Sequence, residues 1–266
     1  MTGTFTSATA VAPLGDERWS ADLASGWDIL GNTHGGYMLA TAARALTAET
    51  HRRDPVTITG HFLTPGRCGP VSIEAATIRA GRRFTTATAT MRSDDGRPLL
   101  AVLATLGDVD EGEGPELVDA EPPHMPSPEE CLLLVGGEPL PPAFSDQVEM
   151  RLHPEDGGFY DGRASGTARM RGWFRLLDGE PIDTIALLCA VDAFPPTSFN
   201  ARLPIGWTPT LELTVHVRAR PEPGWLRCSF RTRFVTGGFL EADGEIWDTS
   251  GRLVAQSRQL ALLARG

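Results

Sequence analysis

Residues 32–46, NTHGGYMLATAARAL, place a polar entry and two glycines directly before a strongly helical run rich in Ala and Leu. Glycine is unfavourable inside a helix, but in the first turn it leaves the unpaired backbone N–H groups open to another group. Those donors, at the positive end of the helix dipole, suit a carbonyl oxygen or an anion. A second interpretation stays open here: Thr33 caps the helix, and Gly35 and Gly36 only allow close packing.

Four β-rich segments follow this helix, and the second half of the chain has a similar succession. In the first half they are 56–63, 71–80, 84–93 and 98–106, separated by plausible turns. In the second half a predicted helix at 180–193 precedes β-rich segments at 210–219, 225–236, 239–248 and 253–263. Each half also has an earlier predicted strand, near 17–22 and 166–176.

The two halves align at a constant offset of 155 residues, without a gap across the four strands. Matches occur at turns and at strand positions alike: His61 with His216, Gly69 with Gly224, Thr77 with Thr232, Phe84 with Phe239, and Gly96-Arg97 with Gly251-Arg252. Agreement at both kinds of position indicates a structural duplication.

One helix followed by four long strands predicts an α+β unit, because the helix must bury its apolar stripe against one face of the sheet. We therefore expect each half to be an antiparallel sheet wrapped around a central helix. Two such units in one chain are expected to pair their sheets edge to edge, which removes exposed strand edges. The predicted molecule is a pseudo-dimer whose sheets are continuous through a pseudo-twofold axis.

The net charge of −10 comes from one segment. Twelve acids and no Lys or Arg lie between Asp108 and Glu149, together with eight prolines, so the rest of the chain is slightly basic. This composition is typical of a solvated connector, here with a short helix expected around 127–135. We expect one folded unit at 1–107 and another at 147–266, with the acidic connector at 108–146 crossing outside them.

Several classes of protein are not indicated. The 266 residues, 41% of them hydrophobic, suffice for a substantial core in a globular protein. No apolar run is long enough to span a bilayer and no signal-peptide pattern is present, so we expect a cytoplasmic protein without a membrane partner. The four cysteines, without a C-x-x-C pair, suggest neither a zinc site nor a disulfide framework. The sequence likewise offers no basic stripe for nucleic acid, and no motif for a cofactor or a metal ion.

The order and spacing of the motifs resemble the double-hotdog acyl-CoA thioesterases, specifically the type II, medium-chain acyl-CoA hydrolase group. The resemblance lies in HGGYMLATAARAL (34–46), TGHFLTPGRCGPVSIEAATIRAGRRFTTATATM (59–91), LLCAVDAFPP (187–196), WTPTLELTVHVRARP (207–221) and DGEIWDTSGRLVAQSRQLALL (243–263). It covers nearly the whole chain except the N-terminal tail and the connector. It implies a tandem hotdog fold, with one hotdog unit in each half, and an enzyme that hydrolyses an acyl-CoA thioester to the free acid and coenzyme A.

The resemblance also implies a catalytic site. In that family a water molecule is held by an Asp at the end of the second-half helix, a Thr or Ser on the next strand and a Gln on the last strand. The matching residues are Asp192, Thr210 and Gln259, with Thr208 and Thr214 as alternatives to Thr210. Thioester hydrolysis needs a base, a group that orients the water and donors for the developing oxyanion.

The residues themselves leave other roles open. Asp192 lies between an apolar run and Phe194-Pro195-Pro196, a surrounding that makes a carboxylate a better base, but it could equally cap a turn. The counterpart of Gln259 is Ala104, so the fold does not require an amide there. A Gln bonded to neighbouring backbone is the alternative.

The helix start supplies the expected substrate-binding and oxyanion residues, which are His34, Gly35, Gly36 and Tyr37. The glycine N–H groups are expected to face the second-half carboxylate and either polarise the thioester carbonyl or line the acyl pocket. For His34 a capping or packing role is the alternative. Two further sets have open roles, as tunnel wall or core and as coenzyme A contacts or solvated surface: Trp173, Trp207, Trp225 and Trp247, and Arg82, Arg83, Arg218 and Arg220.

Two other functions compete with hydrolysis. A hydratase or dehydratase of acyl-CoA would use a His and Asp pair, and His34, His61 and His216 lack an acid at a suitable spacing. A non-catalytic acyl-CoA-binding protein is the third possibility. Because only the second half offers the acid and the amide, we expect one active site per chain. We also expect a homodimer or a higher homo-oligomer.

Overall fold

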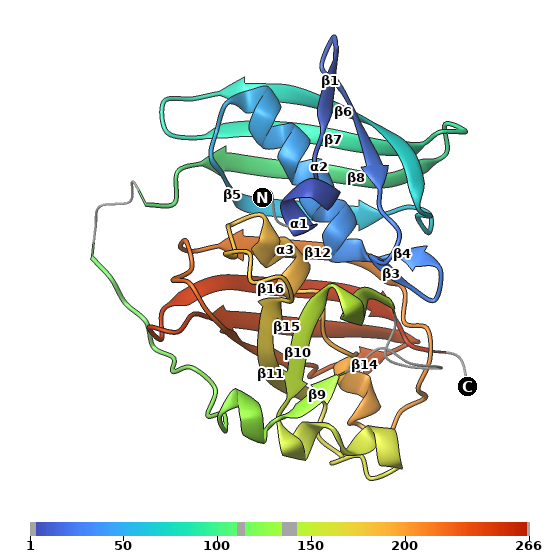
Figure 1. Cartoon of the computed structure of the whole chain (residues 1–266), viewed down its shortest axis with the longest axis vertical. Coiled ribbons are helices and arrows are strands. Elements are labelled where there is room, and N and C mark those ends of the chain that lie inside the picture. The colour runs from blue at the N-terminus through green and yellow to red at the C-terminus, as the bar shows by residue number, and fades with distance from the viewer. Residues whose placement is uncertain (1–3, 111–114, 135–142, 265–266) are drawn as a thin grey trace.

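The computed structural model describes residues 4–110, 115–134 and 143–264, and its main feature is one continuous antiparallel sheet of 14 strands (Figure 1). The strand order is β1-β2-β6-β7-β8-β5-β12-β16-β15-β13-β11-β10-β9, with β14 paired to β15. Strands of the first half thus occupy one side of the sheet and strands of the second half the other.

The first half contains two helices and eight strands among the described residues. They are α1 (Thr4–Ala8), β1 (Ala12–Gly15), β2 (Arg18–Leu23), β3 (Asp28–Ile29), β4 (Asn32–Thr33), α2 (Gly35–Thr50), β5 (Asp54–Phe62), β6 (Gly69–Ala80), β7 (Thr85–Ser93) and β8 (Pro98–Gly107). β3 and β4 form a separate two-stranded sheet.

The second half has more irregular connections. Its helices are α3 (Ala186–Ala190) and five 3₁₀ helices, η1 (Pro128–Glu130), η2 (Ala143–Asp146), η3 (Pro154–Asp156), η4 (Gly158–Asp161) and η5 (Thr197–Phe199). Its strands are β9 (Leu132–Leu134), β10 (Val148–Leu152), β11 (Arg169–Leu176), β12 (Thr210–Val217), β13 (Leu226–Arg231), β14 (Val235–Thr236), β15 (Phe239–Trp247) and β16 (Leu253–Leu262).

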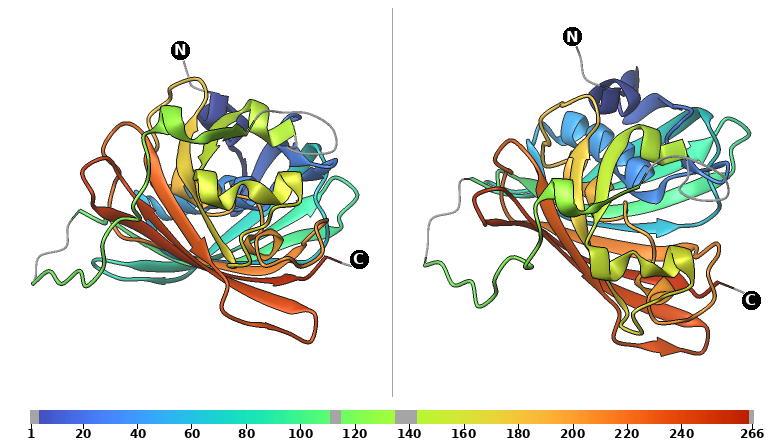
Figure 2. Two further views of the ribbon diagram at one scale, coloured as in Figure 1. Left: turned by 90° about the horizontal axis from the view of Figure 1, so that it is seen from below. Right: turned by 60° about the horizontal axis from the view of Figure 1, so that its bottom comes forward.

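α2 is the central helix of the first half. Its Ala and Leu residues have high helix propensity, and it ends at His51, which adopts a left-handed φ of 54°. Leu39 and Leu46 are buried, as is most of the helix, because it packs on the concave face of the sheet and against α3. Figure 2 shows the curved sheet with the helices gathered on this face. No helix in the described part of the chain could span a membrane.

The two halves join through antiparallel pairing of β5 with β12. Thr59 lies opposite Thr214, and their Oγ1 atoms are 2.8 Å apart. Since these residues are counterparts in the repeat, the pseudo-twofold axis passes between them. Phe84 and Phe239 lie at the starts of counterpart strands and are similarly exposed, by 42% and 44%. The predicted pseudo-dimer of two α+β hotdog units with a continuous sheet is therefore confirmed.

The second-half helix is shorter than the predicted 180–193, because α3 spans only Ala186–Ala190. The Asp183 carboxylate accepts hydrogen bonds from the N–H groups of Ile185 and Ala186, so helical pairing begins only after it. Beyond α3 the chain runs into Pro195 and Pro196, which cannot continue a helix. Asp192 therefore follows directly on the end of a very short helix.

The connector partly follows the expectation. Residues 115–121 are exposed and run outside the sheet (Figure 1). The short helix expected at 127–135 is reduced to η1, and β9 follows it and pairs with β10 at the sheet edge. Val135 lies outside the described residues. The second-half sheet thus extends into the segment that the charge pattern assigned to the connector.

Candidate active site

The carboxylate of Asp192 is held from both halves of the chain. Its Oδ2 atom accepts a hydrogen bond from the Gly36 N–H at 2.8 Å, and its Oδ1 atom accepts one from Gln259 Nε2 at 2.9 Å. The side chain is 12% exposed. An anion at the N-terminus of α2 is stabilised by the helix dipole and by the unpaired amide.

Gln259 and Thr210 lie on the neighbouring strands β16 and β12. Gln259 Nε2 lies 2.5 Å from Thr210 Oγ1, so one amide group connects the hydroxyl with the Asp192 carboxylate. The structure therefore brings together the three side chains that the family resemblance singles out. It also explains why an amide is placed on this strand, since both of its hydrogen-bond partners belong to the site.

The neighbouring threonines have other partners. Thr214 Oγ1 contacts Thr59 at the pseudo-twofold axis and also donates to Glu212 Oε1 at 2.5 Å. Thr208 Oγ1 donates to the Gly206 carbonyl at 3.1 Å. Of the three threonines considered, Thr210 is the one that bonds to Gln259.

The two glycines at the start of α2 are required by close packing. A Cβ atom on Gly36 would lie 2.5 Å from the Leu188 carbonyl oxygen and 3.0 Å from Asp192 Cβ. A Cβ atom on Gly35 would lie 2.8 Å from Asp192 Oδ2. Both interpretations of the sequence therefore hold, because the absence of side chains lets α3 approach α2 and lets the carboxylate reach the N–H groups.

The N–H groups of the first turn of α2 have different partners. Gly36 donates to Asp192, and Tyr37 donates to His34 Nδ1 at 3.1 Å. No acceptor for the Gly35 N–H lies among the described residues, and Gly35 lines the adjoining cavity. Gly35 is thus the N–H of this pair of glycines that is open to a ligand, while Gly36 is committed to the carboxylate.

His34 caps α2 and contacts Asp192 at the same time. Its Nδ1 atom accepts from the Tyr37 N–H, so Nε2 carries the proton and donates to the Asp192 carbonyl oxygen at 2.9 Å. The imidazole stacks on Phe144 with 4.1 Å between ring centroids. Burial lowers the pKa of His34, although the nearby Asp192 carboxylate opposes this. Thr33, considered above as the cap, does not fill that position.

We expect protonation of His34 to destabilise the fold, because a second ring proton would face the Tyr37 N–H. A folded-state pKa below the ordinary 6.5 means that the unfolded chain binds the proton more readily. Stability is therefore lost as the pH falls below about 6.5 towards the folded-state pKa. Thermal unfolding between neutral and mildly acidic pH should show a shallower pH dependence for His34→Asn than for the unmodified chain.

The exposed His61 provides the matched control, since His61→Asn should leave the pH dependence of unfolding nearly unchanged. Burial and the Arg171 charge also lower the pKa of His153, which adds a contribution of the same sign in every variant. Equal slopes for His34→Asn and the unmodified chain would contradict the assignment.

The expected substrate-binding role of Tyr37 is wrong. Its side chain is fully buried, stacks on Trp27, and does not line the cavity. Its hydroxyl donates to the Ala8 carbonyl oxygen at 2.6 Å and accepts from the Ala24 N–H at 3.0 Å. The side chain belongs to the core under α1, because the residue after two N-terminal glycines points away from the site on the helix surface.

A cavity of about 580 Å³ adjoins the catalytic side chains. Gly35, Asp192, Thr210 and Gln259 line it, and most of its remaining wall is apolar. The buried part of that wall includes Met38, Met150, Val191, Phe199, Leu240 and Phe230. Of the four tryptophans considered for the tunnel wall, Trp207 lines the cavity, and it is 42% exposed. The cavity suits a predominantly apolar ligand with its reactive group at Asp192.

None of the four arginines considered for coenzyme A lines this cavity. Arg220 is bound elsewhere, since its guanidinium forms ion pairs with Asp54 and Asp110. Asp54 also accepts a hydrogen bond from Thr184 Oγ1 at 2.8 Å. Arg220 therefore serves the structure at the opposite end of the β5–β12 pair.

That opposite end is the counterpart of the active site under the pseudo-twofold axis. Pro55 and Ala104 occupy the positions that correspond to Thr210 and Gln259. The second position thus lacks the hydroxyl and the amide, and the Asp54–Arg220 ion pair occupies its vicinity. The catalytic constellation described above has no equivalent there.

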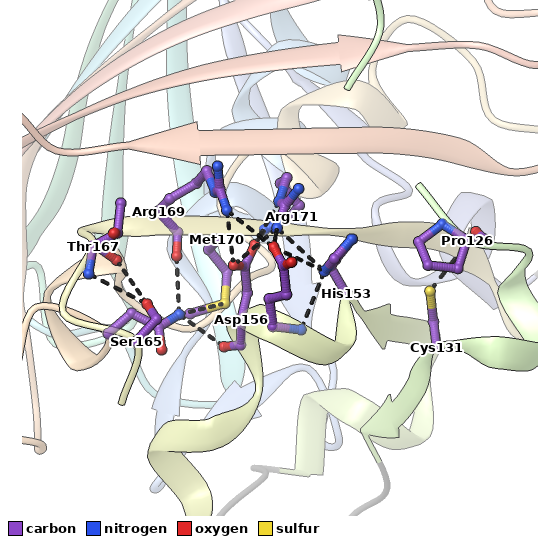
Figure 3. Close-up of polar contacts among 11 residues, drawn as sticks. Pro126, Cys131, His153, Asp156, Ser165, Thr167, Arg169, Met170 and Arg171 are labelled. Atoms are coloured by element: carbon purple, nitrogen blue, oxygen red, sulfur yellow. Dashed lines mark hydrogen bonds and ion pairs between the residues drawn. The ribbon is translucent and has the colours of Figure 1, made fainter. Parts of the chain in front are cut away.

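A second polar cluster in the chain has metal-ligand residue types (Figure 3). Ligand atoms of His153, Glu155 and Asp156 lie within 4.8 Å of one another. The Arg171 guanidinium lies among them, with Nε 2.8 Å from Asp156 Oδ2 and Nη2 2.8 Å from Glu155 Oε2. Because this cation already satisfies the acids, the cluster is an ion-pair network that joins η3 to β11.

Known proteins resemble the chain along nearly its full length. Residues 23–107 match the acyl-CoA thioesterase N-terminal domain, and residues 119–263 match the acyl-CoA thioesterase C-terminal domain. The crystal structure of a candidate thioesterase II from Thermobifida fusca is 32% identical, with a TM-score of 0.89 over 99% of this chain and 98% of that one.

Two further relatives are of unknown function. A conserved protein with a hot dog fold from Alicyclobacillus acidocaldarius is 25% identical, with a TM-score of 0.87 over 100% of both chains. An uncharacterized protein of Mycobacterium tuberculosis is 27% identical over 99% of both chains. The two domain matches cover both halves of the sheet and all the residues of the site, and the chain belongs to the acyl-CoA thioesterase family.

Proposed function

We propose that this protein hydrolyses an acyl-CoA thioester to the free acid and coenzyme A by direct attack of water. The convergence of Asp192, Gln259 and Thr210 at an apolar cavity carries the proposal. A base, a water-orienting pair and an open N–H donor lie together there, next to space for an acyl chain. Membership of the acyl-CoA thioesterase family supports the same reaction.

In the proposed mechanism Asp192 takes a proton from a water molecule that Thr210 and Gln259 orient. The water oxygen forms a bond to the thioester carbonyl carbon, and negative charge develops on the carbonyl oxygen. The Gly35 N–H and the positive end of α2 stabilise that charge. The C–S bond then breaks, and the departing sulfur receives the proton from Asp192. No side chain bonds covalently to the acyl group.

One contact favours the hydratase or dehydratase alternative, because His34 Nε2 lies 3.7 Å from Asp192 Oδ2. The expectation that no His has an acid within reach is therefore wrong in three dimensions. Both ring nitrogens of His34 are bonded to backbone groups, however, and its side chain is fully buried. It cannot deliver a proton to a bound acyl chain, and hydrolysis is the better-supported reaction.

A panel of acyl-CoAs, followed with a thiol reagent, tests the proposal. Release of free thiol is the expected result. Interconversion of enoyl and hydroxyacyl groups without thiol would favour the hydratase, and tight binding without either reaction would favour the non-catalytic alternative. The division at residues 107/108 and 146/147 and the restriction to one active site per chain also remain proposals.

We further propose that the chains associate into a homodimer or a higher homo-oligomer. Large apolar side chains such as Leu103 and Leu260 are exposed on the sheet, by 53% and 38%. Light scattering should give a mass at least twice that of one 28.6 kDa chain at micromolar concentration. A mass close to a single chain would contradict the expectation.

A further inference from the structure

Two hydroxyl groups beside the active site are buried without hydrogen-bond partners. They are Thr33 Oγ1 and Ser145 Oγ, each on a residue that is 6% exposed and that lines the cavity. No partner for either hydroxyl lies among the described residues. Buried hydroxyls are nearly always paired in folded proteins, so two in one otherwise apolar wall indicate a missing partner.

Both hydroxyls lie close to the reacting group. Thr33 precedes His34, and Ser145 follows Phe144, whose ring stacks in parallel on the His34 imidazole at 4.1 Å. His34 in turn contacts Asp192 through Nε2. The two hydroxyl-bearing residues are therefore direct neighbours of a stacked pair that touches the catalytic acid.

The backbone holds both residues in place. The Thr33 N–H donates to the Gly66 carbonyl at 3.0 Å, and Thr33 pairs with Asp28 in the small β3–β4 sheet. Ser145 lies within η2, which packs against β3. The hydroxyls are thus presented to the cavity by fixed backbone rather than by long side chains.

The position in the cavity separates the acyl group from the coenzyme A arm. Exposed cavity residues, among them Leu63, Ile205 and Trp207, mark the mouth, where the hydrophilic arm can leave into solvent. Thr33 and Ser145 instead belong to the buried wall. A plain hydrocarbon chain in contact with that wall would shield both hydroxyls from water without pairing them.

We propose that the preferred substrates carry an oxygen function on the acyl chain near the thioester, such as a β-hydroxy or β-keto group, which pairs with Thr33 and Ser145. This inference rests on the proposed thioesterase function. A hydrogen bond gained in the complex should favour the oxygenated substrate over its plain analogue by about tenfold in kcat/KM.

The experiment compares β-hydroxyacyl-CoAs with unsubstituted acyl-CoAs of the same chain length, over a series of lengths. The unmodified chain should prefer the hydroxy member of each pair about tenfold. Thr33→Val and Ser145→Ala should each move this ratio towards one. Ser198→Ala is the matched control, because Ser198 Oγ is equally buried and unpaired but its residue does not line the cavity, and the ratio should stay unchanged.

A ratio near one or below in the unmodified chain would overturn the proposal. Equal losses for both members of a pair in Thr33→Val and Ser145→Ala would also overturn it, because the hydroxyls would then contact the coenzyme A arm shared by all substrates. Binding of non-hydrolysable thioether analogues of the same pairs gives an independent readout. If no thioester is hydrolysed, the proposed function fails, and the affinity ratio of the analogues still decides the present inference.

Discussion

Replacement of Asp192 by Asn should lower kcat by a factor on the order of 10²–10⁴, the span expected for loss of a positioned general base. The amide cannot take a proton from water, yet it has nearly the shape of the carboxylate. Its oxygen can keep the Gly36 N–H, and its nitrogen can face Gln259 once that amide rotates to present oxygen. The fold should therefore survive, as measured by circular dichroism and thermal unfolding.

Gln259→Ala serves as the comparison for this variant. It should reduce kcat less than Asp192→Asn, because it removes orientation and hydrogen bonds but not the proton acceptor. Ala is also the residue found at the counterpart position, 104, so the strand tolerates it. Full turnover in Asp192→Asn would overturn the mechanism while leaving the fold assignment intact.

Gly36→Ala should have the second largest effect. The new methyl group would lie 2.5 Å from the Leu188 carbonyl oxygen and 3.0 Å from Cys189 Cα, so α2 and α3 must separate. Overpacking of this kind costs about 1–3 kcal/mol of unfolding free energy. Because Asp192 follows α3 and bonds to the Gly36 N–H, the shift displaces the base. A displacement of about 1 Å can cost 10²-fold in turnover.

Ala48→Gly provides a control on the same helix, distant from Asp192. It should cost about 1 kcal/mol through lost helix propensity, while kcat stays near that of the unmodified chain. Steady-state kinetics and melting temperatures of both variants separate a general loss of stability from displacement of the site. Unchanged kcat in Gly36→Ala would show that the close contact of α2 with α3 does not position Asp192.

The positions of most strands could be predicted from residue order, because alternation and turn residues are local properties of the chain. The predicted strand at 98–106 corresponds to β8 at Pro98–Gly107, and the prediction at 71–80 to β6 at Gly69–Ala80. The gap-free repeat also predicted the joined sheet, since counterparts such as Thr59 and Thr214 meet at the axis.

Elements governed by competing local signals were predicted less well. The 180–193 segment is apolar and helical in composition, but Asp183 caps it late and the prolines end it early, which leaves only α3. Leu132–Leu134 lies in a Pro-rich acidic stretch and forms a strand only because β10 offers it an unpaired edge. In both cases a neighbour in space or a single side chain outweighed the average composition.

The sequence by itself determined the duplicated α+β architecture and, through the family resemblance, the candidates Asp192, Thr210 and Gln259. Only the tertiary structure distinguished Gly35, open to the cavity, from Gly36, bonded to Asp192, and placed Tyr37 in the core. Adjacent residues on a helix point in directions about 100° apart, so their partners depend on which distant segments pack there. Spacing along the chain carries no record of those contacts, which arise only when α3 and β16 meet the start of α2.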